Sequence, residues 1–405
     1  MAKTHLYTGY VATAATIIQH YDGATPLNDF LKKYFALHKK FGSRDRRQIT
    51  NLCYCYYRLG FAELGLDTTE RILLALFLCS NDPHEIISEL RPAWKENITA
   101  SITEKLALIG YPFSIQNIFP WQDEISEGID ATAFAESHLI QPDLFLRIRP
   151  GKKEQVIKKL DAAGISYTQP MQDCIAIANN TKIDTVIELN KEAVVQDYSS
   201  QRITGFLQTI KSEISNPKSQ ISVWDCCAAS GGKSILAKDV LGNIDLTVSD
   251  VRSSIIHNLK QRFTAAGITK YHSFVADLTS STANIKFLVP DIIICDVPCS
   301  GSGTWGRTPE QLHFFTAEKI DYYSNLQKQI LQNVLPHVKQ GGYFLYITCS
   351  VFTKENEEVV DFILANSKLQ LIKKEVLIGY DKKADTMFGA LFKHDEKFTK
   401  YTYIE

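Results

Sequence analysis

A run of branched apolar residues that ends in a rigid polar turn constrains this chain most. Residues 291–295 read Asp-Ile-Ile-Ile-Cys. Such an uninterrupted apolar run is typical of a strand that is buried on both faces of a parallel sheet. The next residues, from Asp296, read Asp-Val-Pro-Cys-Ser-Gly and form a turn with a thiol, Cys299, at its tip. Ligands of open α/β sheets bind beyond the carboxyl ends of strands, so we expect Asp296 and Cys299 to lie at a reactive site.

A second segment repeats this pattern. Residues 342–348 are uncharged and mostly apolar, and they lead directly to Cys349 and Ser350. The carboxyl ends of parallel strands meet at one edge of a sheet, so two strands that each end in a cysteine predict two thiols at that edge.

Strand-like and helix-like segments alternate from about residue 220 onward. The expected strands are residues 221–224, 246–248, 271–275, 291–295, 343–347, 369–377 and 387–392. The expected helices are residues 235–241, 253–266 and 317–338, with a further helix that begins at Thr353. This alternation predicts an α/β fold in which helices cover both faces of a mostly parallel sheet.

Two further regions precede the sheet. Residues 1–130 have apolar residues at helical spacing, such as Val11, Ala14 and Ile18, which predicts an all-α domain. A connection over 121–140 is followed by a strand at 145–148, a helix at 153–163 and a strand that begins at 165–167. The expected domains are therefore 1–130, 131–200 and 201–405. A small sheet with one helix is a common RNA platform, but it is also an ordinary packing module.

The charge and the cysteines exclude several classes of protein. A net charge of −1 excludes a uniformly basic nucleic-acid binder but not a local basic face. Nine cysteines without paired Cys-x2-Cys clusters argue against a disulfide framework and against a zinc site, so no metal is expected. Apolar runs of about 20 residues and a signal-peptide core are both missing. We therefore expect a cytoplasmic protein, a monomer, without a membrane segment.

Basic residues cluster in one short part of the helical region. They are Lys32, Lys33, Lys39, Lys40, Arg44, Arg46 and Arg47, with only Asp45 opposing them. Ser43 is the expected N-cap of the helix that follows. Such a patch can neutralise RNA phosphates, and a solvated helix face is the alternative.

A loop of small residues follows the first expected strand of the sheet. It consists of Ala228, Ala229, Ser230, Gly231, Gly232 and Lys233. Small residues let a ligand approach the backbone, and the N-terminus of the next helix favours an anion. A phosphate-binding loop for ATP requires glycine at position 227, where Cys227 stands. The carboxylate of an amino-acid-like ligand is the alternative anion.

Two acids end the next two expected strands. Asp250 is placed to bind a ribose, and Asp277 is placed to lie near the base of an adenosine-containing ligand. Each acid taken alone is more typical of a helix N-cap or a turn. Their recurrence at successive strand ends favours the ligand site.

Seven of the nine cysteines divide into two groups. Five of them fit the common pattern of inert, buried thiols: Cys53, Cys55, Cys79, Cys174 and Cys295. Cys299 and Cys349 instead follow strands and have small polar neighbours, which is typical of a reactive thiol. A thiolate can add to carbon 6 of a pyrimidine and make carbon 5 nucleophilic, while Asp296 bonds a ring nitrogen. One thiol would attack, and the other would assist release.

These segments resemble the Fmu/Sun/Nop-type (RsmB-like) RNA (cytosine-5) methyltransferases, which use S-adenosylmethionine. The resemblance covers residues 195–393 and rests on residues 195–201, 225–233, 291–303, 346–358 and 385–390. It implies that Cys349 attacks the cytosine, that Cys299 assists release and that Asp296 holds the base. It also implies that residues 228–233, Asp250 and Asp277 bind S-adenosylmethionine.

The resemblance also implies an architecture and a substrate. The expected fold is a Rossmann-like methyltransferase with a seven-stranded sheet, preceded by a small α+β RNA-recognition-like module and an all-α NusB-like domain. Residues 42–47 and 56–60 are similar to the NusB-like extension. The expected reaction transfers methyl to carbon 5 of a cytosine in RNA, with 16S ribosomal RNA as the substrate. Transfer RNA, and a non-catalytic RNA-binding assembly factor, are the alternatives.

Two positions depart from the family's usual sequence. Ser230 stands where the cofactor loop usually has proline, and Thr304-Trp-Gly-Arg follows Gly303 where two basic residues are usual. Neither change removes a reacting group. Arg307 is the basic residue that remains there, so we expect it to contact RNA together with Arg44, Arg46 and Arg47.

Overall fold

The chain divides into two units in the computed structural model, which describes residues 2–110, 112–214, 220–280, 285 and 289–394. The helical unit comprises Met1–Ile125, Asp130–Pro142 and Thr304–Ala317. The sheet unit comprises Ser126–Ile129, Asp143–Gly303 and Glu318–Glu405. None of the described helices is long and apolar enough to cross a bilayer.

A seven-stranded, mostly parallel sheet forms the centre of the sheet unit, as expected from the alternating segments. Its strands are β5 (Ile221–Asp225), β6 (Ile244–Asp250), β7 (His272–Val275), β8 (Ile292–Asp296), β9 (Tyr343–Thr348), β10 (Leu369–Leu377) and β11 (Met387–His394). The spatial order is β10-β11-β9-β8-β5-β6-β7. The five strands β5 to β9 pair in parallel, whereas β11 runs antiparallel to β9 and β10. The order reverses between β5 and β8, where ligands of such sheets bind.

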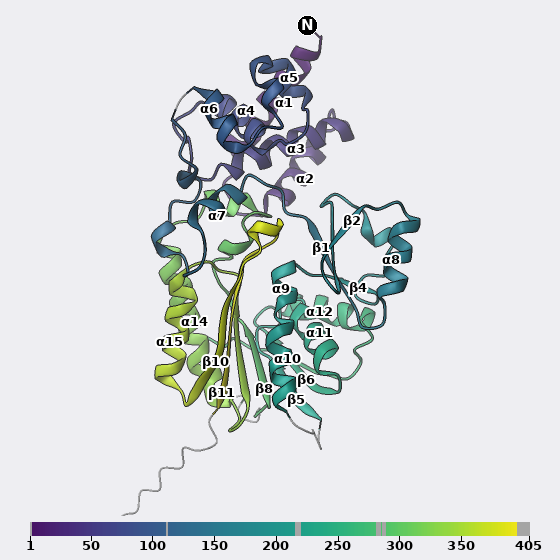
Figure 1. The fold of residues 1–405 in the computed structure, drawn as a ribbon, viewed down its shortest axis with the longest axis vertical. Helices are drawn as coiled ribbons and strands as arrows, with labels where there is room; N and C mark the ends of the chain where they lie inside the picture. Colours follow the sequence, from purple (N-terminus) through teal and green to yellow (C-terminus); the bar gives the residue numbers. More distant parts are fainter. Residues whose placement is uncertain (1, 111, 215–219, 281–284, 286–288, 395–405) are drawn as a thin grey trace, which may run out of the picture. The chain divides into compact units, whose positions relative to one another are not determined.

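Side chains of the central strands alternate between two apolar layers, one on each face of the sheet. Helices cover both faces (Figure 1). On β8, Ile292 and Ile294 face one layer, and Ile293 and Cys295 face the other. The first layer is covered by α10 (Thr204–Glu213), α11 (Gly232–Leu241) and α12 (Ser253–Ala265). The second layer is covered by α14 (Glu318–Val334) and α15 (Glu357–Asn366). Burial on both faces explains why these strands read as continuous apolar runs.

Two expected helices differ from the structure at their ends. The helix expected over 317–338 is α14, which ends at Val334 and continues as a 3-10 turn, η7 (Leu335–His337). Pro336 has no N–H for the next helical hydrogen bond, which explains this end. The segment after Thr353 begins as a 3-10 turn, η8 (Thr353–Glu355), before α15.

A second, four-stranded sheet belongs to the same unit. It consists of β1 (Leu144–Ile148), β2 (Tyr167–Met171), β3 (Cys174–Ile177) and β4 (Ala193–Val195), with α8 (Lys153–Ala162) after β1. The order β2-β3-β1-β4 places β3 between the strands on either side of α8, so the unit is a split β-α-β. Apolar residues of α8, including Val156 and Leu160, pack on β1 and β3. Short elements complete the sheet unit: η4 (Ile183–Thr185), α9 (Tyr198–Arg202) and η9 (Tyr380–Lys382).

The helical unit consists of short helices around an apolar core. They are α1 (Ala2–His20), α2 (Leu27–Leu37), α3 (Ser43–Arg58), α4 (Thr68–Cys79), α5 (Glu85–Leu90), α6 (Ile102–Ile109), α7 (Ala131–Ser137) and α13 (Pro309–His313), with 3-10 turns η1 (Pro92–Asn97), η2 (Ile115–Ile118) and η3 (Gln122–Glu124). The expectation of a plain connection over 121–140 is wrong, because α7 begins there after an N-cap hydrogen bond from Ala133 N–H to Asp130. The expected N-cap of α3 is also wrong by one residue. Gly42 is the N-cap, and its N–H donates to the Asp45 carboxylate.

Arg58 joins three separate parts of the helical unit. Its guanidinium is buried and donates to the carbonyl oxygens of His138, Ile140 and Gly306. Gly306 belongs to the segment that leaves the sheet unit after Gly303 and folds with the helices. Arg58 therefore satisfies backbone carbonyl oxygens inside the helical unit, and its guanidinium is not presented at the surface.

Candidate active site

The two predicted reactive thiols lie next to each other. Sγ of Cys299 is 3.2 Å from Sγ of Cys349, and both cysteines are free and half-buried. The parallel register of β8 and β9 causes this, because Asp296 is paired with Ile347 and each strand continues into a cysteine loop. The hydrogen bond with Cys349, and then burial, raise the pKa of Cys299. Cys299 therefore keeps its proton beside the sulfur of Cys349.

Backbone hydrogen bonds connect the two cysteine loops closely. Gly303 N–H donates to Cys349 O at 2.9 Å, and Thr386 N–H donates to Gly303 O at 2.9 Å. A Cβ atom on Gly303 would lie 1.9 Å from Thr386 O. Only glycine permits this approach, which brings the 385–390 segment against both thiol loops.

A buried carboxylate holds both loops from behind. Glu355 is fully buried and accepts hydrogen bonds from Ser300 N–H, Ser350 Oγ and Gln327 Nε2 at 2.7–2.9 Å. Burial raises the pKa of Glu355. Ser300 follows Cys299 and Ser350 follows Cys349, so this one side chain orients the residue after each thiol. In the sequence, Glu355 lies only within the helix expected from Thr353 onward, and the signal for its role is its place in the family segment 346–358.

Asn356 supports the second loop in the same way. Its side-chain oxygen accepts from Thr348 Oγ1, and its Nδ2 donates to Ser350 O at 3.0 Å. Ser302 Oγ accepts from Val351 N–H at 2.8 Å. These polar groups are buried and partnered, so they rigidify the segment on either side of Cys349.

Asp296 is paired with the cofactor-loop lysine. Its Oδ2 lies 2.9 Å from Nζ of Lys233, in the first turn of α11. The Asp296 side chain is 28% exposed and the Lys233 side chain 10% exposed. The structure thus joins the loop predicted to bind the cofactor to the strand predicted to bind the base.

The glycine loop has the backbone geometry expected for close ligand approach. Gly231 is the N-cap of α11, with φ of 83°, and a Cβ there would lie 2.6 Å from the Phe263 ring. Ala229 also has positive φ, 45°. A Cβ on Gly232 would meet no atom within 4 Å, so the N-terminus of α11 is open at that residue.

Ser230 has a specific partner in place of the usual proline. Arg262 of α12 donates from Nη1 to Ser230 O at 3.0 Å and to Ser230 Oγ at 2.6 Å. A hydrogen bond from a neighbouring helix therefore restrains the position that a proline ring usually restrains.

The two strand-end acids differ in their surroundings. Asp250 is buried and accepts from the backbone N–H groups of Ala229 and Arg252, both at 3.0 Å. Asp277 is exposed and accepts from the N–H and hydroxyl of Thr279, which lower its pKa. Asp250 therefore lies against the glycine loop, whereas the hydrogen bonds that Asp277 accepts come from Thr279 in its own turn.

Asp225, at the end of β5, is a buried acid that sequence analysis did not single out. It is inaccessible to solvent and accepts from Ser234 Oγ at 2.5 Å. Its second oxygen has no hydrogen-bond partner among the described residues. Burial raises its pKa to about 7, because the charged form is poorly solvated there.

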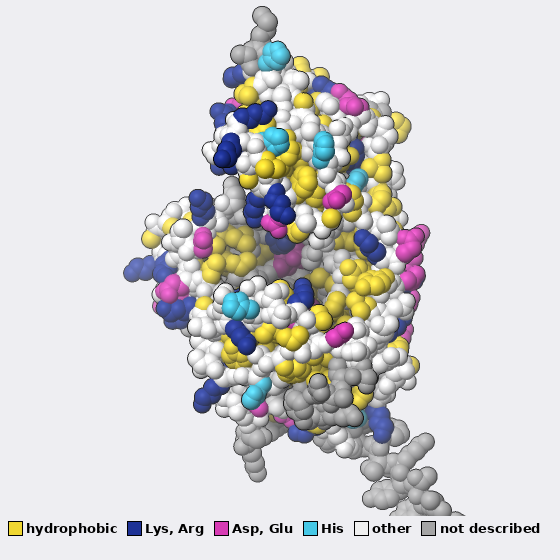
Figure 2. Space-filling view, turned by 180° about the vertical axis from the view of Figure 1, so that it is seen from behind, with side chains coloured by type: hydrophobic (Ala, Val, Ile, Leu, Met, Phe, Trp, Pro, Cys, Tyr) yellow, Lys and Arg dark blue, Asp and Glu magenta, His cyan; other side chains and the backbone are white. Residues whose placement is uncertain are grey.

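The predicted RNA-binding arginines lie in the helical unit. Arg44, Arg46 and Arg47 are exposed in the first turn of α3, where Arg44 pairs with Glu85 at 3.1 Å. Figure 2 shows lysine and arginine side chains gathered along one side of this unit. Arg307 is half-buried two residues after Trp305, whose side chain is fully buried. The Thr304-Trp-Gly-Arg segment, which differs from the family's usual sequence, thus packs into the core of the helical unit through Trp305.

The comparisons with known proteins agree with this geometry. Residues 213–395 match the family described as 16S rRNA methyltransferase RsmB/F. This part of the sheet unit is similar to the RsmB/F methyltransferases. The match spans β5 to β11, the glycine loop and both thiol loops. All of the small sheet and most of the helical unit lie outside it.

Bacterial proteins that are similar to this chain have names that agree with this family description. The chain is 28% identical over 247 residues to "Probable ribosomal RNA small subunit methyltransferase B" of Bacillus subtilis, covering 58% of this chain and 54% of the relative. It is 27% identical over 288 residues to "Ribosomal RNA small subunit methyltransferase B" of Proteus mirabilis, covering 68% and 63%. The chain therefore spans little more than half of the length of these relatives.

Solved structures share the fold. The crystal structure of PH0851 superimposes with a TM-score of 0.66 at 20% identity, covering 95% of this chain and 98% of that one. A methyltransferase homologue from Pyrococcus horikoshii gives a TM-score of 0.55 at 20% identity, covering 72% and 97%. At these identities the likeness establishes the fold alone.

Proposed function

We propose that this chain methylates carbon 5 of a cytosine in RNA, with S-adenosylmethionine as methyl donor and 16S ribosomal RNA as substrate. The observation that carries the proposal is the pair of strand-end thiols, Cys299 and Cys349, 3.2 Å apart. A methyltransferase that transfers methyl directly to an oxygen or nitrogen atom forms no covalent adduct with its substrate, so it has no need of a pair of thiols at its active site. A pyrimidine carbon, by contrast, must be activated by covalent addition.

The attack uses Cys349. Its thiolate sulfur forms a bond to carbon 6 of the cytosine, the electron pair of the 5,6 double bond moves toward carbon 5 and the ring, and carbon 5 becomes nucleophilic. Asp296 bonds the ring nitrogen and stabilises the charge that develops on the base. When bound, S-adenosylmethionine supplies the electrophilic methyl group.

Release uses Cys299. A base removes the proton from the methylated carbon 5, the double bond re-forms, and the electron pair of the carbon–sulfur bond returns to Cys349. Cys299 lies within proton-transfer distance of that sulfur and retains its own proton, so it assists this step.

The residues at the strand ends fit the donor. The positive φ angles of Ala229 and Gly231 and the open space at Gly232 leave room beside the first turn of α11 for a carboxylate. In this proposal Asp250, held by Ala229 N–H, binds the ribose, and Asp277, just beyond the end of β7, would serve the base. Residues 228–233 complete this site.

The rest of the chain binds the RNA in this proposal. The small split β-α-β sheet is an RNA-recognition-like module, and the helical unit is NusB-like. Arg44, Arg46, Arg47 and Arg307 contact phosphates. The relatives' names, which specify the small ribosomal subunit, support 16S ribosomal RNA over transfer RNA. We further propose that the protein acts as a cytoplasmic monomer.

Labelled S-adenosylmethionine tests the proposal when supplied with unmethylated 16S ribosomal RNA and, separately, with transfer RNA. Label in 16S RNA that bisulfite sequencing maps to one cytosine supports it. Label only in transfer RNA would assign the alternative substrate. RNA binding without any label would favour a non-catalytic assembly factor.

A further inference from the structure

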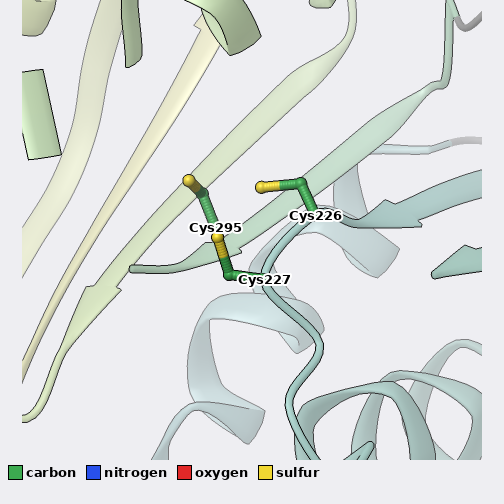
Figure 3. Close-up of side chains that lie close together, drawn as sticks. All are labelled: Cys226, Cys227 and Cys295. Atoms are coloured by element: carbon green, nitrogen blue, oxygen red, sulfur yellow. The ribbon is translucent and has the colours of Figure 1, made fainter. Parts of the chain in front are cut away.

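A second group of thiols lies beside the cofactor loop. Cys226, Cys227 and Cys295 have all three sulfur atoms within 4.8 Å of one another. Figure 3 shows two of them on the loop after β5 and the third on β8, with the three side chains next to one another. Within the described part of the chain, this is the one group of three or more potential ligands close enough to share an ion.

The group is pre-organised by the sheet. Cys295 is a residue of β8, and Cys226 N–H donates to Ile294 O of the same strand at 2.9 Å. On the far side of Cys227, Ala228 N–H donates to Ser249 O of β6 at 2.9 Å. Backbone hydrogen bonds to two strands therefore fix both ends of the Cys226–Cys227 pair.

The spacing suits a soft cation. A zinc–sulfur bond of about 2.3 Å places the sulfurs of a tetrahedral site about 3.8 Å apart. The three sulfur atoms are at most 4.8 Å apart, and small side-chain rotations would shorten these distances to about 3.8 Å. Three sulfur ligands favour thiophilic ions over magnesium or calcium, which prefer oxygen.

Burial and access are both compatible with a bound ion. Cys226 and Cys295 are 1% and 0% exposed, so their sulfurs are shielded from water. Cys227 is half-buried and offers an entry path. The fourth position of the ion would be left to water or a small ligand, as in zinc sites with three protein ligands.

We propose that Cys226, Cys227 and Cys295 bind one thiophilic divalent cation at the base of the cofactor loop. The site differs from the thiol pair of the proposed reaction, since it contains neither Cys299 nor Cys349. It also does not depend on the proposed function, because cation binding requires no RNA and no methyl transfer.

Cadmium titration of the reduced full-length chain tests this site. The parent is a Cys299→Ser, Cys349→Ser double variant, which removes the other thiol pair of the sheet unit. We expect the ultraviolet cadmium–thiolate absorption to show that the parent binds one equivalent of cadmium tightly. Added zinc should displace this cadmium. Adding Cys295→Val to the parent should lower its affinity for this cadmium ion at least tenfold.

Two further variants make the result decisive. Cys227→Ser changes a half-buried position and should also weaken cadmium binding at least tenfold, with thermal unfolding of the metal-free protein showing that it folds. Cys55→Ala removes a buried thiol of the helical unit and should leave the affinity for cadmium unchanged. Binding that survives both Cys295→Val and Cys227→Ser, or that disappears with Cys55→Ala, would overturn the proposal.

Discussion

At the scale of single residues, the two thiols of the candidate active site have different surroundings. Cys299 has a raised pKa through its hydrogen bond with Cys349, and the residue after each thiol is held by Glu355. We expect Cys349→Ala to abolish both methylation and the covalent protein–RNA adduct, because no sulfur remains to attack carbon 6. Labelled RNA on denaturing gels measures the adduct.

The Cys299→Ala change should give the opposite adduct result. Release slows when the assisting thiol is missing, so an adduct that withstands denaturing gels should accumulate while turnover falls. Adduct trapped by Cys349→Ala instead of Cys299→Ala would reverse the two roles.

Substitution of Gly303 should destabilise the fold through a steric clash. Alanine there would place Cβ 1.9 Å from Thr386 O, so the backbone must move. We expect Gly303→Ala to lower the free energy of unfolding by about 1–3 kcal/mol or more, measured by urea denaturation. Gly205→Ala in α10 is the matched control, since nothing lies within 4 Å of its Cβ position. Equal losses in both variants would contradict the steric explanation.

At the scale of elements, Asp225 links the end of β5 to α11 through Ser234. Its pKa rises from 3.8 to about 7 in the folded state, so the folded protein retains a proton that the unfolded chain loses above pH 4. Its contribution to stability is fully present below pH 3.8, decreases as the pH rises and is lost above pH 7. The total change is roughly 4 kcal/mol.

Asp225→Asn removes this titration and tests it. Relative to the unchanged protein, the variant should gain stability progressively between pH 4 and pH 8, as measured by urea unfolding across that range. A constant difference between the two proteins would show that Asp225 ionises normally in the folded state.

At the scale of the whole molecule, the basic turn of α3 lies outside the part of the chain that matches the methyltransferase family. Replacing Arg44, Arg46 and Arg47 by alanine should weaken RNA binding and reduce its salt dependence by a slope of about 2, because each phosphate contact of a single strand contributes about 0.7. Affinity for S-adenosylmethionine should not change. Lys95→Ala is the control for loss of an exposed charge elsewhere in the helical unit. Unchanged RNA affinity would identify the turn as ordinary surface.

Local patterns in the sequence were sufficient for the sheet and for the residues at its strand ends. The apolar run ending at Asp296 and the one ending at Cys349 predicted β8 and β9, because burial on both faces leaves a signal within each strand. Those predictions also placed Cys299 and Cys349 at one edge. The helix α7 was missed, because its seven residues lie in a stretch with little apolar periodicity.

The remaining features depend on contacts between distant segments, which only the tertiary structure decides. Glu355 is a buried acceptor because Ser300 and Gln327 reach it from other elements. Trp305 is buried because its segment folds with the helical unit. Cys295 joins Cys226 and Cys227 through the register of β8 beside β5. Periodicity is a property of one segment, whereas register and burial arise from which segments meet, and that choice is made by the whole chain.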